Sequence, residues 1–263
     1  MTILDQLADH ARHRVAEAKK EVPLEALKRQ ASAAEKGQFV FENAIKKAKM
    51  AFICECKKAS PSKGVIAQDF PYLQIAKEYE AAGADCISVL TEPKWFLGRD
   101  EYLREIAAAV SIPCLRKDFV VDEYMIYEAK LLGASAVLLI CSILSEEEIG
   151  KYIGICNELG LSALVEAHDE TEVAIALRTG ARMIGVNNRN LKDFSVNMDN
   201  CKRLRDLIPR EVIFVAESGV KDASDVARLR EIGADVVLIG EALMRAEDKK
   251  ARLAELRGAV LRK

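Results

Sequence analysis

The sequence AFICECKKASPSKG, residues 51–64, decides the fold because it reads as a buried strand that ends in charged residues and a loop. Alternate residues of a strand point to the same side, so Ile53, Glu55 and Lys57 share one face. Opposite charges at the end of an apolar strand are costly unless they are paired or used. Glu55 and Lys57 taken alone are most simply a structural ion pair, but several later strands end in the same way.

Apolar, β-rich runs like this one alternate with amphipathic helical stretches along the rest of the chain. The eight candidate strands are Phe52–Lys57, Cys86–Thr91, Pro113–Lys117, Ala136–Ile140, Ser162–Glu166, Met183–Val186, Val212–Ala216 and Val236–Ile239. Their nearly continuous apolar character favours a parallel sheet that is covered on both sides. The alternation of strands with helices favours βα units throughout.

A recurring glycine indicates that this sheet closes on itself. Four Gly-Ala pairs end helical stretches and lead into strands about fifty residues apart, namely Gly83-Ala84, Gly133-Ala134, Gly180-Ala181 and Gly233-Ala234. Glycine suits the left-handed position after a helix, and the spacing equals two βα units of a barrel. Because the chain also lacks a dinucleotide-type G-x-G-x-x-G motif, we predict an α/β fold of the (β/α)8 TIM-barrel type, not an open doubly wound sheet.

The residues before the first strand form an N-terminal extension. The apolar pattern predicts a helix over Thr2–Val22, a break at Pro23 and a second helical segment over about Glu35–Met50. This extension is too short for an independent domain. We therefore expect one domain over residues 1–263, in which residues 1–50 are a helical extension over the barrel mouth.

Composition restricts the partners and the compartment. The chain is 50% hydrophobic and 30% charged, with a net charge of −2, which argues against a nucleic-acid or acidic-membrane partner. Its seven cysteines form neither a C-x-x-C pair nor a cluster with histidine at metal spacing. We therefore expect a reducing, cytoplasmic location, no structural metal and no membrane segment.

Polar residues gather where the predicted strands end. In chain order these strand ends carry Glu55 and Lys57, Thr91-Glu92, Lys117-Asp118, Glu166, Asn187 with Arg189, and Glu217-Ser218. The carboxyl ends of barrel strands surround one mouth and carry the chemistry. Two lysines with several carboxylates at one mouth indicate acid–base catalysis. His168 lies just past a strand end, and we interpret it as a loop or capping residue.

The last two βα loops carry a different signal. Ser218-Gly219 follows the seventh predicted strand, and Gly240-Glu241 follows the eighth. Loops in these positions of a barrel commonly hold a phosphate, and glycine lets a backbone N–H approach an anion closely. With Ser60 and Lys57 across the mouth, a phosphate site is the better interpretation than two unrelated turns.

These motifs together resemble one family. They are ECKKASPSKG (55–64), LTE (90–92), LRKDF (115–119), LVE (164–166), GVNNRNL (185–191), AESG (216–219) and IGEALM (239–244). Over essentially its whole length the chain resembles indole-3-glycerol phosphate synthase, a barrel enzyme of tryptophan biosynthesis with an extra N-terminal helical segment. So many ordered matches are far more specific than any one of them.

The resemblance implies a carboxy-lyase reaction without a cofactor. The substrate would be 1-(2-carboxyphenylamino)-1-deoxyribulose 5-phosphate, which yields indole-3-glycerol phosphate with loss of CO2 and water. Lys117 is the candidate acid at the ribulose carbonyl during ring closure. Dehydration needs an acid and a base, and Glu166, Lys57 and Glu55 would divide these roles in an order that the sequence leaves open. Glu217 would orient a lysine or a hydroxyl.

The resemblance also implies how the substrate is held. Asn187 and Arg189 would hold the substrate hydroxyls and the side of the mouth that takes the substrate carboxylate. Asn187 is also one of the proposed catalytic residues. The apolar slot for the anthranilate ring would be formed by Pro61, Phe96, Phe119 and Leu138. The phosphate would lie on Ser60, Lys57, Ser218, Gly219, Gly240 and Glu241, the last two through backbone N–H groups.

Two other functions remain open from the sequence. Phosphoribosylanthranilate isomerase shares the phosphate loops but not the paired lysines of the first and third strands. A non-catalytic phosphosugar sensor would be expected to lose Lys117 or Glu166, and both are present. In every case the partner is a small phosphorylated molecule. We expect a monomer, with weak homo-oligomerisation left open.

Overall fold

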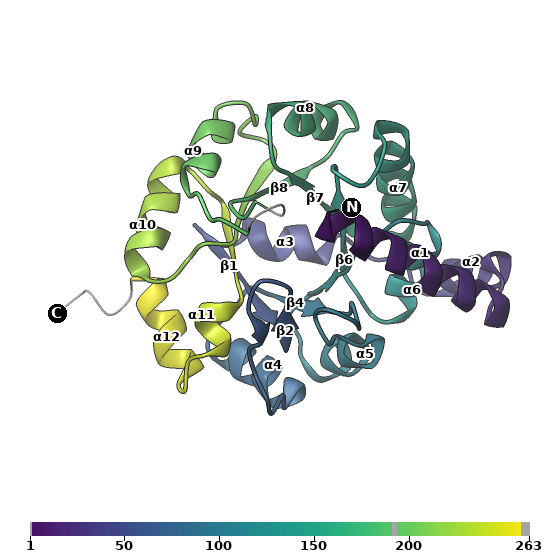
Figure 1. Cartoon of the computed structure of the whole chain (residues 1–263), viewed down its shortest axis with the longest axis horizontal. Helices are drawn as coiled ribbons and strands as arrows, with labels where there is room; N and C mark the ends of the chain where they lie inside the picture. The colour runs from purple at the N-terminus through teal and green to yellow at the C-terminus, as the bar shows by residue number, and fades with distance from the viewer. Residues whose placement is uncertain (1, 191–193, 259–263) are drawn as a thin grey trace.

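The barrel closes as the sequence predicts. A computed structural model describes residues 2–190 and 194–258, so Leu191, the last residue of one motif above, lies outside the described residues. Eight parallel strands pair in the order β1-β10-β9-β8-β7-β6-β5-β4, and β4 pairs with β1 again (Figure 1). They are β1 Ala51–Cys56, β4 Cys86–Leu90, β5 Cys114–Lys117, β6 Ala136–Ile140, β7 Ser162–Ala167, β8 Met183–Asn187, β9 Ile213–Glu217 and β10 Val236–Ile239. Each coincides with a predicted strand and differs by at most one residue at either end.

Helices surround the barrel in Figure 1. They are α4 Tyr72–Ala81, α5 Asp100–Ala109, α6 Tyr124–Leu131, α7 Glu146–Leu159, α8 Glu170–Arg178, α9 Asp199–Arg205, α10 Ala223–Ile232, α11 Glu241–Met244 and α12 Lys249–Leu256. A small antiparallel hairpin of β2 (Ala59–Ser60) and β3 (Gly64–Val65) forms the loop after β1. Among these helices, no residue run is long and apolar enough to cross a membrane in the part of the chain that the structure describes.

Local sequence signals begin and end these helices. Ser145 caps α7 by accepting from the Glu148 N–H, while the Glu148 carboxylate accepts from the Ser145 N–H. The four glycines predicted to follow helices all have positive φ, between 78° and 87°, a conformation that costs glycine little. They are Gly83, Gly133, Gly180 and Gly233. The prediction that these positions end helices is therefore confirmed.

Alternate side chains of each strand face the barrel interior and the surrounding layer of helices. Ile53, Leu115 and Leu164 are fully buried in one cluster inside the barrel, whereas Cys54 and Val165 belong to the cluster between strands and helices. Residues two positions further along the same faces are polar. The interior therefore changes from packed apolar side chains to Glu55, Lys117 and Glu166 at the carboxyl ends of the strands.

The N-terminal extension follows a different path from the predicted one. Its helices are α1 Ile3–Glu21, α2 Leu24–Ala33 and α3 Val40–Lys46. The helical segment predicted over about Glu35–Met50 contains α3 but is too long, and α2 was not predicted. The predicted break at Pro23 is confirmed: α1 ends at Glu21, and Pro23 is the N-cap of α2, a position where proline loses no hydrogen bond.

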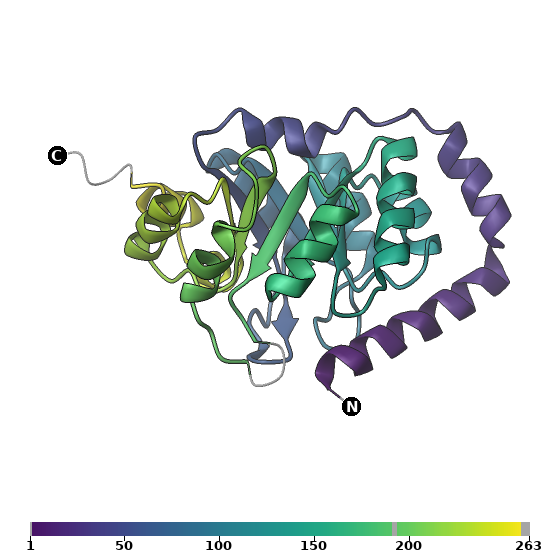
Figure 2. The ribbon, with the colours of Figure 1, turned by 90° about the horizontal axis from the view of Figure 1, so that it is seen from above.

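The extension wraps around one side of the barrel, as Figure 2 shows. Only α1 approaches the mouth, α2 packs on α6, and α3 covers the opposite end, where Phe41 and Ile45 are buried against the starts of the strands. The expectation that all of residues 1–50 lies over the mouth is therefore wrong for α2 and α3. The apolar strand starts need a cover of their own, and α3 supplies it.

Candidate active site

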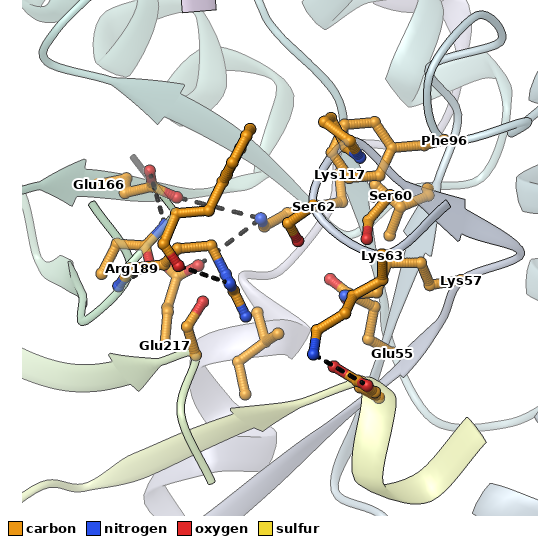
Figure 3. Close-up of a pocket in the computed structure, with 18 of the residues that line it drawn as sticks. Glu55, Lys57, Ser60, Ser62, Lys63, Phe96, Lys117, Glu166, Arg189 and Glu217 are labelled. Atoms are coloured by element: carbon orange, nitrogen blue, oxygen red, sulfur yellow. Dashed lines mark hydrogen bonds and ion pairs between the residues drawn. The ribbon is translucent and has the colours of Figure 1, made fainter. Parts of the chain in front are cut away.

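The carboxyl ends of the strands surround one cavity of about 500 Å³. Figure 3 shows charged side chains from several strands pointing into it. It is lined by every residue that the sequence proposes for the site, namely Glu55, Lys57, Ser60, Pro61, Phe96, Lys117, Phe119, Leu138, Glu166, Asn187, Arg189, Glu217, Ser218, Gly219, Gly240 and Glu241. The structure thus brings the proposed catalytic, ring-binding and phosphate-binding residues together.

Lys117 lies between two buried carboxylates at the centre of the cavity. Its Nζ atom is 3.6 Å from Glu217 Oε2 and 4.0 Å from Glu166 Oε2 (Figure 3). Burial lowers the pKa of Lys117, but the charges of Glu217, Glu166 and Glu55 outweigh burial and raise this pKa above its usual value. The side chain therefore enters the reaction as an ammonium that can donate a proton.

Glu166 and Glu217 differ in protonation although they face the same lysine. Burial raises the pKa of Glu166, but contact with His168 and the charge of Lys117 outweigh it and hold this pKa well below its usual range. Burial and the charge of Glu166 raise the pKa of Glu217 to about 8. At neutral pH Glu166 is therefore ionised and Glu217 carries a proton. A Cβ at Gly185 would collide with the Glu217 carboxyl group, so glycine makes the room for it.

Glu55 and Lys57 form the ion pair expected from their shared strand face. Lys57 Nζ donates to Glu55 Oε1 at 2.5 Å, and Ser88 Oγ lies 3.4 Å from Glu55 Oε2. Burial raises the pKa of Glu55, but Lys57 and then Lys117 outweigh it and lower this pKa. A Cβ at Gly240 would lie 2.6 Å from Glu55 Oε1 and 2.9 Å from Lys57 Nζ. A side chain at position 240 would therefore displace the ion pair, a reason for glycine that the sequence did not reveal.

Asn187 and Arg189 are held at the end of β8. The Asn187 Nδ2 group donates to Glu166 Oε1 at 3.3 Å, and its Oδ1 atom accepts from the Arg189 N–H at 2.9 Å. The Arg189 guanidinium donates to the Phe194 carbonyl at 3.0 Å while lining the cavity. Asn187 therefore orients a catalytic carboxylate, and Arg189 brings a positive charge to the cavity wall.

The two proposed phosphate loops meet at one side of the cavity. Ser218 and Gly219 both have positive φ, 65° and 93°, which turns the backbone sharply after β9. The carboxylate of Glu241 binds Arg245 at 3.1 Å and Lys63 at 3.7 Å. These two cations offset a negative charge that would otherwise repel an anion at this loop. Lys63 lines the cavity and was not proposed from the sequence.

An apolar wall faces these charges. The rings of Phe96 and Phe119 lie 6.1 Å apart at an angle of 40°. The wall continues onto α1, whose Ile3, Leu4 and Leu7 also line the cavity. The sequence shows that α1 has an apolar face, but not that the first turns of this face complete the site.

Two of the strand-end carboxylates hold the loops in place instead. The Glu92 carboxylate accepts the backbone N–H groups of Lys94, Trp95 and Phe96 at 2.7–3.0 Å, and so fixes the loop that carries the Phe96 ring. The Asp118 carboxylate accepts from Arg14 at 2.6 and 3.1 Å and from the Thr91 hydroxyl at 2.6 Å. These two carboxylates therefore hold the loops and α1 around the mouth, and we assign them no part in the reaction.

The closed (β/α)8 barrel and the buried lysines and carboxylates at its mouth define an enzyme of the acid–base class. The family model described as "Indole-3-glycerol phosphate synthase" matches residues 4–256. The chain therefore belongs to the indole-3-glycerol phosphate synthase family, which are carboxy-lyases of tryptophan biosynthesis.

Individual relatives agree with the family. The chain is 55% identical over 258 residues to an indole-3-glycerol phosphate synthase of Ruminiclostridium cellulolyticum, covering 98% of this chain and 99% of the relative. It is 48% identical over 267 residues to one of Lachnoclostridium phytofermentans, covering 97% and 98%. Among solved structures, 3-hexulose-6-phosphate synthase from Salmonella typhimurium superposes with a TM-score of 0.66 over 81% of this chain and 99% of that one. At 16% identity, this last likeness shows the fold alone.

Proposed function

We propose that Lys117 starts the conversion of 1-(2-carboxyphenylamino)-1-deoxyribulose 5-phosphate to indole-3-glycerol phosphate by protonating the ribulose carbonyl oxygen. The observation that carries this role is the place of the Lys117 ammonium between Glu166 and Glu217. The aromatic carbon that bears the carboxylate attacks the carbonyl carbon, and the oxygen takes the proton as the new bond forms. Loss of CO2 then restores the aromatic ring.

The shape of the cavity supports one orientation of the substrate. Phe96, Phe119, Leu138 and Pro61 supply an apolar slot for the anthranilate ring. Ser60, Lys57, Ser218, Gly219, Gly240 and Glu241 surround the region for the phosphate. With the two ends bound in this way, the carbonyl between them lies beside Lys117. Such positioning of the reacting groups supplies a large share of the rate.

The final dehydration has its acid and its base on opposite sides of the site. We assign the base to Glu166, which is ionised at neutral pH, and the acid to Lys57, which Glu55 holds at 2.5 Å. Glu166 takes the proton from the carbon next to the ring nitrogen, while Lys57 protonates the hydroxyl that leaves as water. Glu217, which is protonated, orients Lys117. Each proton transfer contributes about 10²–10⁴ to the rate.

The experiment is a turnover assay that follows indole absorbance and fluorescence when purified protein meets the substrate. Wild-type turnover should collapse in Lys117→Ala and in Glu166→Gln. Lys94→Ala is the control, because Lys94 is exposed beside the mouth and stacks on Trp95. Tight phosphate-dependent binding without turnover by the wild type would instead favour a sensor.

We infer further that the enzyme works as a cytoplasmic monomer without a nucleic-acid partner. The seven cysteines are all free and buried, which suits a reducing compartment. The large apolar side chains that are exposed among the described residues are scattered, namely Val40, Val65, Leu131, Val196 and Leu207. Light scattering should give a mass near 29.1 kDa, and twice that mass would contradict the monomer.

A further inference from the structure

The geometry points to His168 as a positioning residue: we propose that His168, fixed by Glu172 and Ser142, keeps Glu166 ionised and turns one Glu166 oxygen toward Lys117. This inference rests on the proposed function only in that Glu166 acts during turnover. His168 follows β7 directly, two residues after Glu166, so it shares the strand face of that carboxylate. It would act through Glu166 and not on the substrate.

The two oxygens of Glu166 have separate partners. Oε1 lies 3.2 Å from His168 Nε2 and 3.3 Å from Asn187 Nδ2. Oε2 lies 4.0 Å from Lys117 Nζ. Oε1 thus accepts a hydrogen bond from Asn187 and lies within ion-pair distance of His168 Nε2, a buried nitrogen without a hydrogen-bond partner among the described residues, so a small turn of either side chain aligns this pair and leaves Oε2 for the cavity. Glu166 is only 2% exposed, so it has few other partners to hold this orientation.

The far side of the imidazole is held equally firmly. Glu172 Oε2 lies 3.0 Å from His168 Nδ1 and accepts the His168 backbone N–H at 2.7 Å. The other oxygen of Glu172 accepts from the Ser142 hydroxyl at 2.5 Å. A carboxylate at each ring nitrogen favours the imidazolium, because only this form donates from both nitrogens.

The charges around His168 agree with this form. Burial lowers the pKa of His168, but contact with Glu166 and Glu172 outweighs it and raises this pKa to about 10. Asp169, the N-cap of α8, accepts from the Glu172 N–H, and Cys141 at the end of β6 stays a neutral thiol because burial raises its pKa. From α9, the uncharged Asn200 donates to the His168 carbonyl. Among the described residues, Lys117 on β5 is the other cation within 4.0 Å of the Glu166 carboxylate.

The consequence concerns the proton that Glu166 and Glu217 share. Below the pKa of His168 the imidazolium stabilises the Glu166 anion, so the proton resides on Glu217. Without His168, the Glu166 carboxylate has only Lys117 and Asn187 as partners, and it competes with Glu217 for that proton. A base that is partly protonated at working pH removes a proton less often. His168 therefore helps to set which carboxylate is the base.

The test compares His168→Leu, which removes the donor, with His168→Gln, whose amide N–H replaces Nε2–H without a charge. For His168→Leu we expect kcat to fall about tenfold to a hundredfold while KM stays within about threefold. The acid limb of kcat/KM should move to higher pH by about one unit or more, since an opposite charge at this distance shifts a carboxyl pKa by that amount. His168→Gln should keep the shifted limb, because it restores no charge, and should recover most of kcat at pH values above that limb, where Glu166 is ionised.

Glu172→Gln, with Glu170→Gln as its matched control, tests the second half of the network. Both residues lie in the first turn of α8, but Glu170 is exposed and pairs with Arg203. Glu172→Gln should move the acid limb in the same direction as His168→Leu, and Glu170→Gln should leave it in place. Unchanged limbs in both His168 variants and in Glu172→Gln would overturn the proposal.

A readout without substrate separates this proposal from the catalytic assignment. The carboxyl carbon NMR signal of Glu166 can be assigned by its loss in Glu166→Gln and titrated in the free protein. In the wild type it should stay at the ionised position well below the usual carboxyl range, and in His168→Gln it should titrate at higher pH. The same titration in both would reject the role of His168, even if Glu166 proves essential for turnover.

Discussion

Lys117 Nζ lies 3.6 Å from Glu217 Oε2, although the two residues belong to strands β5 and β9, which do not pair. The contact exists because inward-facing strand ends meet across a narrow barrel mouth. Glu166 reaches the same ammonium from β7 at 4.0 Å. One cation between two buried carboxylates leaves a proton to be divided between the carboxylates.

Glu217→Gln should remove the basic limb of the activity profile. The pKa of Glu217 is raised to about 8, so the carboxyl is neutral below that pH and becomes a second anion beside Lys117 above it. A glutamine amide stays neutral at all pH values. Turnover of the wild type should fall above about pH 8, and that of Glu217→Gln should not. Rate profiles with the same basic limb in both proteins would contradict the assignment.

Arg14→Ala should weaken substrate binding by loosening α1. The Arg14 guanidinium holds the buried Asp118 carboxylate with two hydrogen bonds, and the same helix contributes Ile3, Leu4 and Leu7 to the cavity wall. We expect KM to rise about tenfold. The free energy of unfolding should fall by only about 1–3 kcal/mol, because the Thr91 hydroxyl still donates a hydrogen bond to the Asp118 carboxylate. Arg12→Ala is the control, since Arg12 is exposed on α1 and pairs with Asp9. Equal KM values in the two variants would refute the role of α1.

Gly240→Ala should damage catalysis more than folding. The added Cβ would lie 2.6 Å from Glu55 Oε1 and 2.9 Å from Lys57 Nζ, so the ion pair must move. We expect kcat/KM to fall about a hundredfold or more, because Lys57 serves both phosphate and dehydration. Gly154→Ala is the matched control: a Cβ there meets nothing within 4 Å inside α7, and alanine should stabilise the helix by about 0.5–1 kcal/mol. Full activity of Gly240→Ala would disprove this account of the glycine.

Phe119→Ala should separate ring binding from phosphate binding. Phe119 packs near Phe96 on the apolar wall and belongs to none of the proposed phosphate loops. We expect KM for the substrate to rise about tenfold to a hundredfold, since a large aromatic contact contributes roughly 1.5–3 kcal/mol. Inhibition by inorganic phosphate should stay unchanged. A parallel loss of phosphate inhibition would mean that the two subsites are misassigned.

Much of the barrel follows from local sequence. Each strand is a short apolar run bounded by polar residues, and a period of two then fixes which side chains face inward. That rule places Glu55 above Ile53 and Glu166 above Leu164 without any knowledge of neighbouring strands. Convergence at the mouth follows from closure of the barrel, which is why all the proposed site residues line one cavity.

Other features depend on contacts between distant parts of the chain and could not be predicted. Arg14 and Asp118 are 104 residues apart, and the sequence around neither residue predicts that they pair. The path of α3 depends on the apolar strand starts that it covers. His168 has the local appearance of a capping residue, and only the placement of Glu172 and Ser142 shows what holds its ring toward Glu166.

The central claim is that Lys117 donates the proton in ring closure, before CO2 leaves. Single-turnover release of CO2 from substrate labelled in its carboxylate, measured beside indole formation, tests it most directly. We predict that Lys117→Ala loses both signals, whereas Glu166→Gln still releases CO2 but forms indole slowly, because its defect falls after ring closure. Release of CO2 by Lys117→Ala at the wild-type rate would contradict the account.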